Sequence, residues 1–118
     1  MIQKNKPLQP TKQRSVRRCA LVASAQVIEP LSGTRLSGRT SEIGLGGCYV
    51  DVLNPLPNGT LVELRILRDQ GVFEAKAKVV YIDPGFGMGV AFTEMTADKR
   101  AVLEAWLVEI VSQFKSVS

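Results

Sequence analysis

The sequence predicts a mainly β protein: an antiparallel β-barrel of six or seven strands, followed by one C-terminal amphipathic helix. Three observations predict this fold. The 118-residue chain contains several short β-prone segments at regular spacing, separated by turns rich in Gly, Pro and Asn. Helical periodicity is confined to residues 97–114, so no helix connects successive strands as a parallel sheet would require. A closed or nearly closed barrel leaves such a set of antiparallel strands without open edges.

The first half of the chain supplies three of the expected strands. Residues 19–28 (CALVASAQVI) are β-prone and end where Glu29-Pro30 stops the run. Residues 34–43 alternate polar and small or apolar side chains, with Arg35, Ser37, Arg39 and Ser41 on the expected wet face. A glycine-rich break at 44–47 separates this strand from the next one, at 48–53.

The second half supplies the remaining strands. Residues 60–68 and 72–82 are separated by Asp69-Gln70-Gly71, which predicts a hairpin loop. Asp83-Pro84-Gly85 predicts another turn before the last strand, at 86–92. A period of two in the 72–82 segment predicts one shared apolar face, formed by Phe73, Ala75, Ala77, Val79 and Tyr81.

Residues 97–114 predict a helix that packs on the barrel or across its mouth. Thr96 is the expected N-cap, and Asp98 in the first turn suits the helix dipole. The apolar side chains at helical spacing form one stripe, which consists of Leu103, Trp106, Leu107, Ile110 and Phe114. We assign Trp106 and Phe114 to the core and not to a base-stacking surface.

The positive charge of the chain is concentrated at its N-terminus. The net charge is +4, yet residues 1–18 carry six basic side chains and no acidic one. We therefore expect a flexible basic arm at 1–13 and one domain, including the helix, at 14–118. A basic arm of this kind is either a solvated tail or a segment that binds phosphate, nucleic acid or an acidic surface.

Composition excludes several classes of function. The chain has no histidine, and its two cysteines, Cys19 and Cys48, are isolated, so neither a metal site nor a disulfide framework is expected. We find no nucleophile with a base and no convergent acid–base pair, and we therefore do not expect an enzyme. The sequence contains no apolar run of 18 residues and no secretory signal, so we expect no membrane insertion and a cytoplasmic location.

The first candidate binding motif is the Arg-rich end of the arm, Gln13-Arg14-Ser15-Val16-Arg17-Arg18. Arg14 and Arg18 have the spacing Arg-x-x-x-Arg, and Arg17 lies between them. The planar guanidinium donates two parallel hydrogen bonds to phosphate or to guanine O6 and N7, and it stacks on bases. By itself this spacing is weak evidence, because any basic tail produces it by chance.

The second candidate motif is Glu42-Ile43-Gly44-Leu45-Gly46-Gly47, at the end of the second expected strand. Three glycines in four positions permit positive φ and let backbone N–H groups approach a ligand closely. A tight β-turn explains the same residues. The motif is no P-loop, because no Gly-Lys-Ser/Thr follows it. A second glycine cluster at 85–89 is best explained as a barrel strand relieved by glycine.

Together the two motifs are much more specific than either alone. An Arg-x-x-x-Arg arm, an acidic-x-x-x-x-Gly turn about 25 residues later, and a barrel ending in Gly-x-Gly-Val-x-Phe resemble the PilZ domain family. The resemblance extends from about Arg14 to the C-terminal helix. It implies a six- or seven-stranded antiparallel barrel that binds cyclic di-GMP, often as an intercalated dimer.

The resemblance also implies roles for single residues. Arg14 and Arg18 would hold guanine edges and phosphates, with Arg17 beside them in the arm. Glu42 would accept hydrogen bonds from guanine N–H groups. Gly44 would contact the ligand from the turn, and Gly47 would keep the turn open.

The chain departs from the family motif Asp/Asn-x-Ser-x-x-Gly at two positions. Glu42 replaces Asp or Asn, which keeps the carboxylate and adds a methylene with more rotamer freedom to lose. Gly44 replaces Ser and removes a hydroxyl. A lost hydrogen bond to a charged partner costs about 1.5–3 kcal/mol, or roughly one to two decades of affinity.

Three functions remain open from the sequence. The first is a cyclic di-GMP receptor whose arm becomes ordered on ligand capture and which passes the signal to a separate, unidentified protein. The second is an adaptor that binds protein without nucleotide, as the changes at Glu42 and Gly44 suggest. The third, a polynucleotide-binding barrel, is not expected, because most of the seven aromatic residues fall on apolar faces. Arg35 and Arg39 are candidates for additional positive potential near the site.

Overall fold

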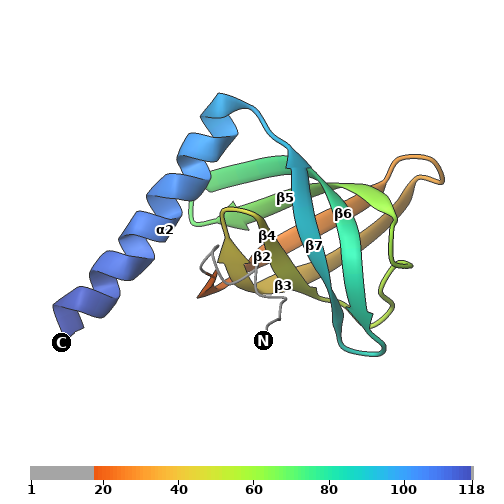
Figure 1. Cartoon of the computed structure of the whole chain (residues 1–118), viewed down its shortest axis with the longest axis horizontal. Coiled ribbons are helices and arrows are strands. Elements are labelled where there is room, and N and C mark those ends of the chain that lie inside the picture. Colours follow the sequence, from red (N-terminus) through yellow and green to blue (C-terminus); the bar gives the residue numbers. More distant parts are fainter. Residues whose placement is uncertain (1–17, 118) are drawn as a thin grey trace, which may run out of the picture.

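The computed structural model describes residues 18–117, which form a closed six-stranded antiparallel barrel and one helix (Figure 1). The strand order around the barrel is β2-β3-β4-β7-β6-β5, and β5 pairs with β2 to close it. This confirms the predicted fold. The bounds are β2 Arg18–Glu29, β3 Thr34–Gly44, β4 Gly47–Asp51, β5 Leu61–Arg68, β6 Gly71–Asp83, β7 Gly87–Glu94 and α2 Ala97–Val117.

The turns lie where glycine, proline and aspartate predicted them. Asp69-Gln70 joins β5 to β6, and Asp69 has a φ of 53°. Three further turns each contain a glycine in the left-handed region, which only glycine adopts without a steric cost; these are Gly33, Gly59 and Gly85.

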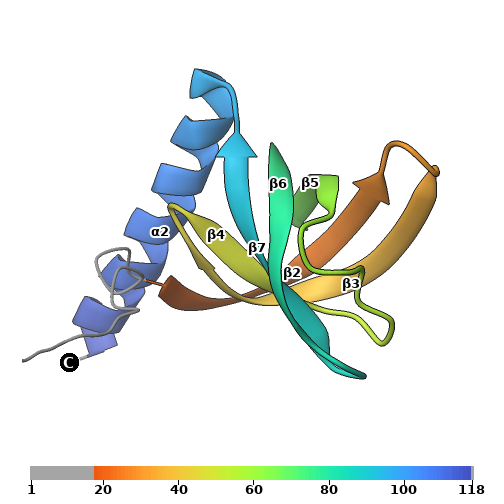
Figure 2. The ribbon, with the colours of Figure 1, turned by 45° about the vertical axis from the view of Figure 1, so that its right-hand side comes forward.

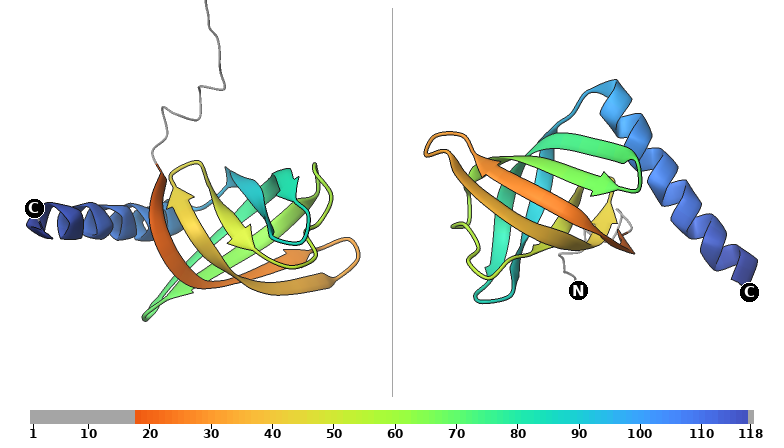
Figure 3. Two further views of the ribbon diagram at one scale, coloured as in Figure 1. Left: turned by 90° about the horizontal axis from the view of Figure 1, so that it is seen from below. Right: turned by 180° about the vertical axis from the view of Figure 1, so that it is seen from behind.

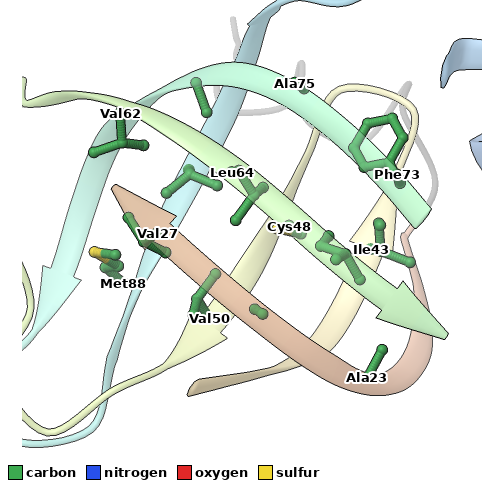
Figure 4. Packing of buried hydrophobic residues seen from close by; sticks show 14 of the residues in the cluster. Ala23, Val27, Ile43, Cys48, Val50, Val62, Leu64, Phe73, Ala75 and Met88 are labelled. Carbon is green, nitrogen blue, oxygen red and sulfur yellow. The ribbon is translucent and has the colours of Figure 1, made fainter. Parts of the chain in front are cut away.

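Side chains from all six strands fill the barrel interior. In β2 each second residue from Leu21 to Val27 is buried, and β5 and β6 repeat the pattern. Figure 4 shows these side chains meeting between the walls, with Val27, Val50, Leu64 and Met88 among them. Thr40 is the buried polar residue of this core, and its hydroxyl donates to the carbonyl of Leu21 at 2.8 Å. The interior is therefore a packed core and not a ligand cavity.

Bulges shift the alternation at two places that matter for the outer surface. Between Thr40 and Glu42, β3 contains one residue more than β4, so Thr40 points into the core while Glu42 is exposed. Between Val79 and Tyr81, β6 likewise contains one residue more than β7. Tyr81 is consequently 43% exposed, and its predicted place on the apolar face of β6 is wrong.

The helix α2 packs its first half across the β5–β6 end of the barrel, and its second half extends beyond the barrel (Figures 2 and 3). Leu103 and Trp106 are buried, and the Trp106 ring lies edge-on to Phe73 with 6.4 Å between ring centroids. The hydroxyl of Thr96 accepts from the backbone N–H of Lys99 at 3.2 Å, which confirms the predicted N-cap. The core position of Trp106 is confirmed, while the side chain of Phe114 lies outside the described part. Within residues 18–117 no helix has the length and apolar character that spanning a bilayer requires.

Candidate functional site

The β2–β3 ladder brings parts of both sequence motifs together. Arg18, the first residue of β2, pairs with Gly44, and Ala20 pairs with Glu42. Opposite residues of an antiparallel ladder point to the same face of the sheet, and so do residues two apart on one strand. Arg18, Gly44 and Glu42 therefore lie on one face, although Arg18 and Glu42 are 24 positions apart in the chain.

That face is the outer wall of the barrel. Arg18, Ala20 and Glu42 are exposed, whereas Ile43, between the two turn positions, is fully buried. A guanidinium and a carboxylate thus stand near each other on the solvent side of the wall. This pair offers donors for phosphate or guanine O6 and N7 from Arg18, and acceptors for guanine N–H groups from Glu42.

The turn between β3 and β4 lies between Gly44 and Gly47. In the described chain the glycines with positive φ are those at 33, 59 and 85, so the glycines at 44–47 do not use the positive φ that they permit. Position 47 requires glycine because β4 lies very close to β7 there. A Cβ at this position would overlap the carbonyl oxygen of Val90 on β7. The carbonyl of Gly46 accepts from the N–H of Phe92 at 2.8 Å. The turn is therefore held flat against β7.

The other four arginines that the sequence analysis named as candidates are not placed at the site by the structure. Arg14 and Arg17 lie outside the described residues. Arg35 pairs with Ile28, nine positions along β3 from Gly44, and at 3.3 Å per residue this is about 30 Å away. Arg39 pairs with Ser24 on one side and Asp51 on the other. The structure therefore does not bring Arg35 to the site as the sequence suggested.

The two cysteines are free thiols. Cys48 lies inside the barrel wall behind the turn, and burial raises its pKa to about 12, with a smaller opposing effect from Arg18. A thiol that remains protonated at neutral pH is a poor nucleophile and a poor metal ligand. In the described part of the chain, no group of three or more Cys, Asp or Glu side chains is arranged to hold a metal ion.

Sequence reasoning missed an aromatic pair beside Glu42. Tyr49 pairs with Glu42 across the β3–β4 ladder and with Gly89 across the β4–β7 ladder. Tyr81 pairs with Gly89 from the other side, on β6. The two tyrosine rings are 6.1 Å apart. The period of two in β4 was the available signal for Tyr49, whereas Tyr81 is exposed by a bulge that the sequence pattern does not reveal.

A hydrogen bond fixes Tyr49 in place. Its hydroxyl donates to Oδ2 of Asp83 at 2.7 Å. Desolvation, together with that hydrogen bond and the nearby charge of Asp83, raises the pKa of Tyr49 to about 12. The phenol therefore stays protonated and continues to donate at all physiological pH values.

A cavity of about 610 Å³ lies elsewhere, on the outer face of β2, β5 and β6 beside the start of α2. It contains none of the motif residues. Its charged side chains partly neutralise one another, as in the pairs Arg65–Glu74 at 3.6 Å and Lys99–Glu74 at 3.7 Å. We do not assign the ligand site to this cavity.

Comparison with solved structures identifies the same fold in three proteins. The PilZ domain with c-di-GMP of YcgR from Escherichia coli is 15% identical with a TM-score of 0.71, over 88% of this chain and 95% of that one. The PilZ domain of CeSA from a cellulose-synthesizing bacterium is 16% identical with a TM-score of 0.62, over 79% and 96%. The inhibitor of motility MotI/DgrA of Bacillus subtilis is 20% identical with a TM-score of 0.66, over 84% of this chain and 52% of that one.

No curated protein matches the chain by sequence. The family model of the PilZ domain, however, matches residues 11–109, which include both motifs and most of the helix. Family model, strand order and motif placement agree, and we conclude that this chain belongs to the PilZ domain family.

Proposed function

We propose that this protein is a signalling receptor that binds cyclic di-GMP through its arginine-rich arm and the β3–β4 turn. Ligand capture orders the arm against the barrel and changes the surface presented to a separate partner protein. The proposal is for a binding module and not for an enzyme, and for a protein of the cytoplasm. The presence of c-di-GMP in the YcgR PilZ domain of the same fold supports the choice of ligand.

One observation carries the proposal: Arg18 pairs with Gly44 and lies on the same outer face as Glu42. This register joins the end of one motif to the start of the other. Four residues of chain extend at most about 14 Å, so the Cα of Arg14 lies within that distance of the Cα of Arg18. We infer that Arg14, Arg18 and Glu42 contact the same nucleotide.

The chemistry of these groups matches the ligand. Arginine forks donate to phosphate oxygens and to guanine O6 and N7, while a carboxylate accepts from guanine N1–H and N2–H. Glu42 has a longer side chain than the family's Asp, and Gly44 provides no hydroxyl. We therefore expect an affinity about one to two decades below that of a site with the complete motif. The ligand binds as a monomer or as an intercalated dimer, and titration reports which.

Isothermal titration with cyclic di-GMP tests the proposal. Wild type is expected to bind, Arg14→Ala and Arg18→Ala to bind at least tenfold more weakly, and Arg35→Ala to bind as wild type does. Arg35 is the matched control because it is an exposed β3 arginine far from the turn. Absence of heat and of a melting-temperature shift at about 100 μM ligand would overturn the proposal, since this concentration exceeds micromolar Kd values a hundredfold. Equal binding by both arm variants would place the ligand elsewhere.

The second candidate function is an adaptor that binds a partner protein without nucleotide. The observation that favours it is the pair of substitutions at Glu42 and Gly44, which alter two of the three turn positions. The same titration separates the two functions. The adaptor function is supported if the wild type binds no cyclic di-GMP and the Glu42→Asp/Gly44→Ser variant binds it. That result would show that the turn has lost its ligand-binding residues.

A further inference from the structure

The outer wall next to Glu42 carries two tyrosines that lie over glycines, and we call Tyr49 and Tyr81 the tyrosine shelf. A Cβ at Gly87 would be 2.7 Å from the Tyr49 ring, and a Cβ at Gly89 would overlap the ring of Tyr81. The absence of side chains at these two β7 positions therefore lets both rings lie down on the wall.

The shelf has a defined geometry before any ligand arrives. The two rings are tilted by 33° with 6.1 Å between their centroids. Tyr49 is anchored to Asp83 through its hydroxyl at 2.7 Å. Tyr81 remains 43% exposed. Tyr49 is thus held by its hydrogen bond, and Tyr81 provides the exposed ring on which a flat ligand can stack.

The shelf continues the row of residues that begins at Glu42. Glu42 pairs with Tyr49, and Tyr49 pairs with Gly89, beneath the Tyr81 ring. Neighbouring strands are about 4.8 Å apart, so the Tyr81 ring is roughly 10 Å from the Glu42 backbone. Two bases linked through a small ring of two phosphates span such a distance.

Both Glu42 and Tyr81 face solvent because of bulges, one in β3 and one in β6. Bulges of this kind redirect side chains and are over-represented next to binding sites. Two independent irregularities thus expose an acceptor and an aromatic ring on the same row of the wall.

We propose that the tyrosine shelf and Asp83 form a second guanine-binding position, for the base not held by Glu42. This inference rests on the proposed function. The guanine stacks on the exposed face of Tyr81, and Asp83 accepts from its N1–H and N2–H groups with the oxygen that Tyr49 leaves free. Adenine has no N1–H donor, so the position favours guanine.

Titration of shelf variants with cyclic di-GMP tests this position. Tyr81→Ala is expected to weaken binding about 5- to 100-fold, which is the range for removal of one aromatic stacking partner. Tyr81→Phe keeps the ring and is expected to bind within about threefold of wild type. Melting temperatures of both variants verify that they are folded.

Asp83→Asn tests the base-specific part, with Asp69→Asn, an exposed aspartate in the β5–β6 turn, as its control. Asp83→Asn is expected to reduce the preference for cyclic di-GMP over cyclic di-AMP, whereas Asp69→Asn retains that preference. If wild type binds and Tyr81→Ala binds equally well, the second position is wrong and the receptor function stands. If wild type itself does not bind, the proposed function fails and the second position fails with it.

Discussion

Arg18 lies directly opposite Gly44 across the β2–β3 ladder, with its side chain on the same outer face as that of Glu42. The pairing explains why the two motifs, far apart in the chain, belong to one site. A serine at position 44, as in the family motif, would place its hydroxyl beside the Arg18 side chain. The hydroxyl that Gly44 lacks is therefore missing next to Arg18.

The first prediction concerns restoration of the turn. The double substitution Glu42→Asp/Gly44→Ser is expected to tighten cyclic di-GMP binding about 10- to 100-fold, because it returns one hydrogen bond to a charged partner and shortens the acceptor. Isothermal titration measures the change. Ser37→Ala, on the far half of β3, is the control and should have no effect. Weaker binding by a folded double variant would contradict the site geometry.

The second prediction concerns Gly47. Gly47→Ala introduces a Cβ into the carbonyl oxygen of Val90, a backbone atom that cannot rotate away. Overpacking of this kind costs about 1–3 kcal/mol, which lowers the melting temperature by several degrees. Circular dichroism melting provides the measurement, with the exposed substitution Gln70→Ala as the comparison. An unchanged melting temperature would show that β4 and β7 separate more easily than their pairing implies.

The third prediction concerns the ionisation of Tyr49. The Tyr81→Phe variant has Tyr49 as its single tyrosine, so its tyrosinate absorbance reports that residue alone. The expected midpoint lies above the ordinary pKa of 10.0, because desolvation and the interactions with Asp83 remain, although the smaller contribution of Tyr81 is removed. Asp83→Ala in the same background removes the hydrogen bond and should lower the midpoint. A midpoint that Asp83→Ala leaves unchanged would rule out the hydrogen bond as a cause.

The same shift has a consequence for stability at alkaline pH. The folded pKa of Tyr49 is raised above its unfolded value, so the native state holds the proton more tightly. The resulting stabilisation is fully present below about pH 10 and is lost as the pH rises to about 12. Denaturant unfolding of wild type and Tyr49→Phe should therefore converge in stability across this interval.

The fourth prediction concerns the attachment of α2. Trp106 packs against Phe73 and against Gly71 at the start of β6, and Arg68 lies 5.9 Å above its ring. Trp106→Ala is expected to destabilise the protein by about 3–5 kcal/mol, as large aromatic truncations in a core do. Trp106→Phe keeps part of the packing and should cost less. Urea unfolding measures both, and a loss of less than 1 kcal/mol for the alanine variant would mean that the helix is not part of the cooperative unit.

Much of the fold was predictable because its signals are local. Turn residues separated the strands correctly, and alternation identified the buried positions of β6 from Phe73 to Val79. The helix and its cap at Thr96 followed from spacing and side-chain chemistry. The inward position predicted for Tyr81 was wrong because the β6–β7 ladder contains an extra residue there, and a bulge depends on the partner strand and leaves no local pattern.

For the candidate site, the sequence by itself determined the chemistry. It supplied the arginines at 14, 17 and 18, the carboxylate of Glu42 and the glycine turn that ends at Gly47. The tertiary structure alone decided which of these side chains share a surface. Strict alternation along β3 would have turned Glu42 inward with Thr40, and the bulge between them turns it outward to the face of Arg18. A side chain's direction in a barrel depends on register with its neighbours, and register is a property of the closed sheet rather than of any one strand.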